Sequence, residues 1–389
     1  MRKIAVIGLL ALTASMVGTP SYAGGSHKPT LTGWASLPAG TFVPGSEPSG
    51  ALVTGNLNGF TAPFADQPIQ GFSGIVDNGD GTFDVLSDNG YGNQANSGDF
   101  LLRVQKLAPV FKSNKVDVLG GITLTDPNAK VPWKLTRADR VLTGADFDPE
   151  SIVKVADGSY WIGDEFGPYL LHFDRAGRLL DAPVALPGVI APETAARTGE
   201  TATARSSKGF EGLAVAPDGR HLYALLEGTV TGDPAGSLRL NEFDVLRKQY
   251  TGKRWTYQLD NPDFAIGDAI SIADGRFLII ERDNGQGATA VTKKIYEAVV
   301  QRDGSLKKTL VVDLMNVSNP RKIGGFGTTF TFPFQTIEDV VILDNRTIAV
   351  LNDNNFPFST GRSATAADNN EWITIALPSS LRVDRRLLP

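Results

Sequence analysis

Residues 149–165 read PESIVKVADGSYWIGDE. The stretch opens beside Glu150, runs through an apolar segment to Asp157-Gly158, and returns through a second apolar segment to Glu165. Asp-Gly supplies the positive φ angles of a tight primed turn, so this stretch predicts a β-hairpin. Such a hairpin would carry a carboxylate near each of its open ends.

The same pattern occurs five times along the chain. Its counterparts begin near Ser73, Glu211, Asp268 and Glu338, at intervals of roughly 57 to 77 residues, which is typical of a repeat architecture. Two further apolar stretches follow most of the hairpins, so each repeat would supply four strands. Four-stranded repeats predict the blades of a propeller. We therefore expect an all-β chain that forms a single β-propeller.

The fifth repeat shows only three candidate strands, the last at 372–376. The apolar segment from Leu31 to Leu37 offers the missing strand and would close the ring from the N-terminal side. Five repeats are visible, and a degenerate sixth could lie in residues 100–146. The sequence thus predicts five to six blades closed by an N-terminal strand.

Acidic residues recur at the open ends of the hairpins. Reflection of each hairpin about its turn pairs the residues that open and close it: Ser73 with Asp88, Glu150 with Glu165, and Asp268 with Glu281. Glu227 and Asp353 fit the same scheme if their turns are one or two residues longer. Carboxylates that face each other across two strands repel unless a positive charge lies between them. Repeated around a ring, they would focus a negative potential at one mouth of the channel.

One or more hard cations would offset this repulsion. An all-oxygen ligand set suits Ca²⁺ best, with Mg²⁺ and Mn²⁺ as alternatives. A single acid at a strand end is more often a loop cap or an ion-pair partner than a ligand, but recurrence at one position of successive repeats favours a shared role. The predicted metal ligands are Glu150, Glu211, Glu227, Asp268, Glu338 and Asp353.

The N-terminal residues have the pattern of a secretory signal. Arg2 and Lys3 precede an apolar run from Ile4 to Leu12, and Ser21-Tyr22-Ala23 forms a small-x-Ala cleavage site. The run is too short to span a membrane. We expect a signal peptide at 1–23, a propeller domain at 24–389, and a periplasmic or extracellular location.

Composition excludes several classes of partner and chemistry. The chain has no cysteine, which excludes disulfides, thiolate catalysis, zinc–sulfur sites and a lipoprotein anchor. Removing the two basic residues of the signal leaves 35 basic against 42 acidic residues, a net charge of 35 − 42 = −7. An acidic exported protein is a poor partner for nucleic acid. We expect a monomer with no nucleic-acid partner and no membrane anchor.

Other catalytic patterns are missing from the sequence. Residues 71–75 approach Gly-x-Ser-x-Gly but fail at the last position, and there is no Walker A loop. The histidines His27, His172 and His221 lie away from the acids, so a Ser-His-Asp triad is not expected. Arg282 could hold an anionic substrate or simply neutralise an acid.

Five strings of the chain resemble one known family. They are FDPES at 147–151, GDEFGP at 163–168, GFEGLA at 209–214, IERD at 280–283 and NDNNF at 352–356. These are similar to the phytase-like domain family, described by the esterase-like activity of phytase, and the resemblance covers roughly residues 60 to 377. It implies an exported β-propeller that hydrolyses a small anionic phosphoester or a carboxyester.

The leading hypothesis is a metal-dependent ester hydrolase that acts on phosphoesters. Glu165 and Glu281 would serve as further ligands or as the base that activates water, and Arg282 would hold the anion. A second hypothesis is a lactonase or carboxylesterase at the same metal. A third is a non-enzymatic propeller in which Ca²⁺ only stabilises the blades and one face binds a partner. Metal analysis together with a hydrolase panel would distinguish the three.

Overall fold

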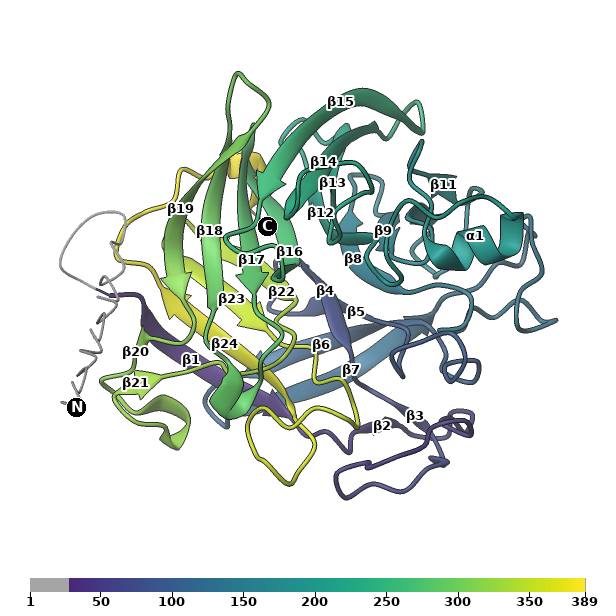
Figure 1. Cartoon of the computed structure of the whole chain (residues 1–389). Helices are drawn as coiled ribbons and strands as arrows, with labels where there is room; N and C mark the ends of the chain where they lie inside the picture. Colours follow the sequence, from purple (N-terminus) through teal and green to yellow (C-terminus); the bar gives the residue numbers. More distant parts are fainter. Residues whose placement is uncertain (1–27, 389) are drawn as a thin grey trace, which may run out of the picture.

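Five four-stranded blades surround a common centre in the computed structural model, which describes residues 28–388 (Figure 1). Neighbouring strands within each blade are antiparallel, and the inner strands of successive blades contact one another around the ring. A parallel bridge between β1 and β7 joins blades 5 and 1 into one larger sheet. The predicted all-β single propeller is therefore confirmed. The predicted signal peptide at 1–23 lies outside the described residues. None of the helices in 28–388 is long and apolar enough to cross a membrane.

The strands of each blade follow one another from the channel outward. Blade 1 contains β4 (Phe72–Asp77), β5 (Phe83–Ser87), β6 (Arg103–Val110) and β7 (Lys115–Thr123); blade 2 contains β8 (Pro149–Lys154), β9 (Tyr160–Asp164), β10 (Tyr169–Phe173) and β11 (Val184–Ala185). Blade 3 contains β12 (Phe210–Val215), β13 (His221–Leu226), β14 (Ser237–Asp244) and β15 (Gln249–Gln258); blade 4 contains β16 (Ala265–Ala273), β17 (Arg276–Arg282), β18 (Lys293–Val300) and β19 (Leu306–Asp313). Blade 5 contains β22 (Asp339–Asp344), β23 (Thr347–Leu351), β24 (Asn370–Ala376) and β1 (Thr30–Leu37).

Short elements decorate the blades. Two-residue strands form the pairs β2 (Phe42–Val43) with β3 (Gln67–Pro68), and β20 (Val317–Ser318) with β21 (Thr329–Phe330). The helical segments are α1 (Pro192–Thr198), η1 (Gly287–Thr289), η2 (Ile323–Gly325) and η3 (Arg385–Leu387).

Strand β1 closes the ring, as the sequence predicts. It pairs antiparallel with β24 from Thr30–Ala376 to Leu37–Asn370, and Ser36 also bridges to Lys115 of β7. One N-terminal segment thus completes blade 5 and joins it to blade 1. The sixth blade suggested for residues 100–146 is wrong, because β6 and β7 are the outer strands of blade 1 and residues 124–146 form a long loop.

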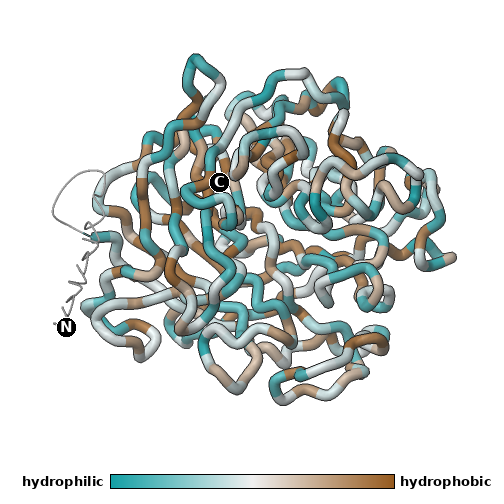
Figure 2. The backbone as a smooth tube through the Cα atoms, in the orientation of Figure 1, coloured by the Kyte–Doolittle hydropathy of each residue, from teal (hydrophilic) through white to brown (hydrophobic). Residues whose placement is uncertain are grey.

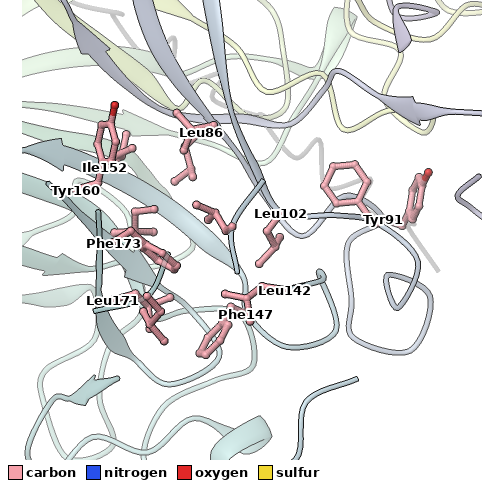
Figure 3. Close-up of a cluster of buried hydrophobic side chains, with 14 of the residues drawn as sticks. Leu86, Tyr91, Leu102, Leu142, Phe147, Ile152, Tyr160, Leu171 and Phe173 are labelled. Carbon is pink, nitrogen blue, oxygen red and sulfur yellow. The ribbon is translucent and has the colours of Figure 1, made fainter. Parts of the chain in front are cut away.

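Each interface between neighbouring blades has its own hydrophobic cluster. Between blades 1 and 2, Leu86 packs with Ile152 and Phe173 (Figure 3). The closing interface between blades 5 and 1 holds Phe83 and Trp372, whose ring centroids lie 4.7 Å apart. Figure 2 shows hydrophobic stretches recurring along the strands. Burial of this surface drives the blades together, so every blade depends on two neighbours.

The Asp-Gly turns gather at one end of the channel. Gly158 and Gly219 have φ of 81° and 67°, the positive values that the predicted turns require. Inner-strand residues next to the turns of all five blades line one cavity of about 240 Å³, which Arg386, Leu387 and Leu388 also line. The amide of Asp384 donates to the carbonyl of Ile272 over 2.7 Å and fixes this C-terminal segment. The hairpins' open ends therefore form the opposite mouth.

Replacing Ala35 by Asp should open the ring. Ala35 is fully buried in the cluster between blades 5 and 1, so an unpaired carboxylate there should lower the free energy of unfolding by about 3 kcal/mol or more. Urea denaturation monitored by circular dichroism measures the change. Thr32→Asp, at an exposed position of the same strand, should cost less than about 1 kcal/mol. Equal losses from both variants would mean that β1 is not a closing strand.

Candidate functional site

A β-bulge at the start of the inner strand aims the acids into the mouth. In blade 2 the pairing runs from Pro149–Asp164 to Ser151–Gly163 and skips Glu150. In blade 3 the same shift skips Glu211. A bulge inserts one unpaired residue and redirects its side chain. Both glutamates are buried at this end of the channel.

The observed registers define two sets of equivalent positions. The bulge position holds Ser73, Glu150, Glu211 and Gly267 in blades 1 to 4, and Glu338 lies directly before the first paired residue of blade 5. The position just beyond the facing register on the second strand holds Asp88, Glu165, Glu227, Arg282 and Asp353. Blade 4 is therefore the exception, with glycine and arginine where other blades have polar or acidic residues.

Two of the predicted site residues lie outside the mouth cluster. Asp268 is one residue past the bulge, where its carboxylate accepts hydrogen bonds from the amides of Ala269 (2.7 Å) and Val340 (3.0 Å) and fastens blade 4 to blade 5. Glu281 is one residue before Arg282 and points away from the channel. Its oxygens accept hydrogen bonds from the Asp260 amide, the Tyr257 hydroxyl and the Lys308 ammonium, each at 2.7 Å. Reflection of the hairpin about its turn assumes a regular register. The bulge shifts the register, so both predicted positions are displaced by one residue.

Four of the other predicted acids converge with Asp148 in two overlapping groups, whereas Glu338 and Asp353 belong to neither group. In each group, one carboxylate oxygen per residue lies within 4.8 Å of the others. Asp148, Glu150 and Glu165 form the first group, and Glu165, Glu211 and Glu227 form the second. All are buried, and Glu165 belongs to both groups. The sequence did not single out Asp148, although it stands two residues before Glu150 in the string at 147–151.

Asp148 is held by neighbours from blade 1 and from the loop before β12. Its carboxylate accepts hydrogen bonds from the Asn89 amide group at 2.7 Å and from the Ser207 hydroxyl at 3.2 Å. On the far side of the ring, Glu338 accepts from the Ser73 hydroxyl at 3.1 Å. These hydrogen bonds fix the direction of the carboxylates without adding positive charge.

Two cations partly neutralise the cluster. One guanidinium nitrogen of Arg282 lies 3.3 Å from Glu338, 3.4 Å from Glu227 and 3.9 Å from Glu211, while the other donates to Asn284 at 3.0 Å. Lys208 forms an ion pair with Glu227. Arg282 thus replaces a carboxylate at the blade 4 position and acts as an internal counter-charge. The remaining carboxylates still exceed the cations.

Burial raises the pKa of several acids at the mouth. For Glu338, burial and then repulsion from Asp353 raise the pKa to about 8, and for Asp88, burial and then Asp148 raise it to about 8. Burial, and after it repulsion from Glu227, raises the pKa of both Glu165 and Glu211 well above the usual range. The site therefore holds protons at neutral pH unless another positive charge enters.

The residues present fit a hard cation. Oxygen Oε1 of Glu165 and Oε1 of Glu211 are buried and have no hydrogen-bond partner among the described residues. Buried carboxylate oxygens without a donor are costly, and an all-oxygen set of this kind is what Ca²⁺ or Mg²⁺ prefers. Asp148, Glu150, Glu165, Glu211 and Glu227 are the residues that could hold it.

The described histidines are elsewhere in the fold. His172 stacks on Trp161 with centroids 4.3 Å apart and contacts Asp181 and Ser159 in an outer part of blade 2. His221 contacts Asp218 beside the turn of blade 3. The sequence-based expectation that both lie away from the acids is confirmed.

The family is shown by a match over most of the propeller. Residues 67–356 match the family model Phytase-like, described as esterase-like activity of phytase. The chain belongs to this family. The strings at 147–151, 163–168 and 209–214, which carry much of the acidic cluster, fall within the matched region.

A curated relative and two solved structures are also similar. A protein of Arthroderma benhamiae described as an uncharacterized secreted protein is 26% identical over 224 residues, which span 47% of this chain and 43% of that protein. This chain therefore matches less than half of the relative's length. A thermostable family-43 glycoside hydrolase has a TM-score of 0.43 at 9% identity, covering 81% of this chain and 95% of the other. A family-43 β-1,3-galactosidase has a TM-score of 0.44 at 9% identity, covering 80% of this chain and 59% of the other.

Chelator-treated protein should lose stability as the pH rises. The raised folded-state pKa values mean that the folded protein holds protons that the unfolded chain releases. The stability that these retained protons contribute is fully present below about pH 4, which is the pKa range of the same carboxyl groups in the unfolded chain. It is lost as the pH passes through about 8, the pKa of Asp88 and Glu338. Melting temperatures from pH 5 to 9 in chelator should fall, and added Ca²⁺ should reduce the fall. A constant or rising melting temperature in chelator would contradict the buried cluster.

Proposed function

We propose that this protein is an exported, metal-dependent ester hydrolase that acts on phosphoesters. The observation that carries the proposal is the pair of buried acid groups joined by Glu165, with donor-free oxygens on Glu165 and Glu211. Membership of a family described by esterase-like activity supports a hydrolase. The signal-like sequence at 1–23 and the match to a secreted protein support export.

The chain's own carboxylates would divide the work. Asp148 with Glu150 in the first group, and Glu211 with Glu227 in the second, would hold one or more divalent cations, with Ca²⁺ as the first candidate. When bound, such an ion supplies Lewis-acid chemistry by offsetting negative charge on the ester oxygens. Glu165 is the proposed general base, because it borders both groups and keeps one oxygen free to accept a proton from water.

Arg282 has a supporting role in this proposal. Burial would lower the pKa of Arg282, but Glu227, Glu338 and Glu211 outweigh burial and raise it, so the guanidinium remains charged. From blade 4, it contacts Glu227 of blade 3 and Glu338 of blade 5 and holds both in place. Glu338 and Asp353 would contribute to the negative field. Asp268 and Glu281 are not part of the proposed site, since their carboxylate oxygens accept structural hydrogen bonds.

Calcium should raise the melting temperature of the metal-free protein. A ligand that binds only the folded state at 100 times its dissociation constant adds about 2.7 kcal/mol of stability. Glu211→Gln should lose most of this response, because the substitution removes a carboxylate ligand from the second group. Glu47→Gln should keep it, since Glu47 pairs with Arg137 on the surface. No calcium, magnesium or manganese response in the unaltered protein would exclude a resident cation at this site.

Glu165→Gln should abolish ester hydrolysis while the fold is retained. Removal of a positioned general base commonly lowers the rate by about 100-fold or more. Glu281→Gln should instead lower stability and leave the rate per folded molecule within about threefold, because Glu281 lies in the Tyr257–Lys308 network. Assays on phosphomonoesters, carboxyesters and lactones, with folding checked by circular dichroism, measure both effects.

The same panel separates the alternatives. Turnover of carboxyesters or lactones without phosphate release would favour a lactonase or carboxylesterase at this site. Metal binding without any turnover would favour a calcium-stabilised binding propeller. Full phosphoester activity in Glu165→Gln would remove Glu165 from the mechanism.

A further inference from the structure

A polar pocket opens beside the acid cluster between blades 3 and 4. Its volume is about 730 Å³, within the range of about 300–1,000 Å³ found for small-molecule sites. The loop from Glu227 to Gly236 forms one wall, the residues before β16 form another, and Arg205 and Lys208 lie on the loop before β12. Glu227 and Lys208 belong to the acid cluster as well, so the pocket and the cluster share these side chains.

The pocket borders blade 4, the one blade with no carboxylate at either of the two equivalent positions. In blade 4 the bulge position is Gly267 and the facing position is Arg282. Arg282 donates to Asn284, which lines the pocket. An anion that approached over the other blades would face buried acids, whereas in this pocket Glu227 is paired with Lys208 and Asp233 with Arg239. Blade 4 is therefore the electrostatically favoured entrance for an anion.

The charges on the pocket lining support this direction of approach. Arg205 is exposed and forms no ion pair with any residue of 28–388. Asp233 is neutralised by two hydrogen bonds from Arg239, of 2.6 and 2.9 Å. Asp263, at the exposed rim, is the lining carboxylate without a cationic partner in the described part of the chain. A free guanidinium is suited to bidentate contact with a phosphate or carboxylate group.

We propose that this pocket receives the substrate and that Arg205 selects esters carrying an anionic group over neutral esters. The inference rests on the proposed hydrolase function for its catalytic meaning, but anion binding by Arg205 stands without it. Lys208 lies beside Glu227, where the pocket meets the acid cluster. Arg205 is thus a specificity residue at the entrance, distinct from the residues that would hold a cation.

Binding of inorganic phosphate by the purified protein tests the pocket directly. Calorimetric titration should give a dissociation constant that rises about tenfold or more in Arg205→Ala, because a charge-assisted hydrogen-bond pair is lost. Arg205→Lys should recover part of the affinity. Arg302→Ala is the matched control, since Arg302 is also exposed and unpaired among the described residues but lies in the β18–β19 turn at the opposite end of blade 4. Arg302→Ala should leave the constant unchanged.

Kinetics separates this inference from the proposed function. In an active enzyme, Arg205→Ala should raise KM for 4-nitrophenyl phosphate about tenfold, with kcat and the KM for 4-nitrophenyl acetate unchanged within about twofold. Arg205-dependent phosphate binding without hydrolysis of any ester would refute the proposed function and sustain the pocket. Hydrolysis with an unaltered KM in Arg205→Ala, or phosphate binding that does not depend on Arg205, would overturn the pocket assignment.

Discussion

Repulsion among buried carboxylates is the constraint on which the mouth of this propeller depends. Glu150, Glu165, Glu211 and Glu227 are brought together by strands of two blades, and neither group of acids could persist if the strands were free to separate. Two cations and a set of hydrogen bonds offset part of the charge. The rest must be met by protons or by a bound cation.

Ring closure supplies the opposing force. A hydrophobic cluster occupies each blade interface, so moving one blade outward to separate its acids would disrupt the clusters at both of its interfaces. Strand β1 closes the ring because it completes blade 5 and also bridges to blade 1. The fold therefore stores an unfavourable electrostatic arrangement at one end of the channel and covers the other end with its C-terminal segment.

The sequence predicted most of the architecture because its signals are local. Asp157-Gly158 and its counterparts specify turns by backbone geometry, and the apolar segment 31–37 was recognisable as the strand missing from blade 5. The site was predicted less well. Asp268 and Glu281 were misplaced because a β-bulge shifts the register by one residue, and the bulge depends on pairing rather than on residue type. Asp148 joins the cluster from a loop, whose course periodicity does not indicate.

Proton release on metal binding tests the central claim most directly. Because the acids are buried, they retain protons in the metal-free protein, and a cation must displace these protons as it binds. Titration of metal-free protein with Ca²⁺ in two buffers of different ionisation enthalpy measures the number of protons released. We predict net release at neutral pH, reduced in Glu165→Gln. Binding without proton release, or no binding of any divalent cation, would contradict the account.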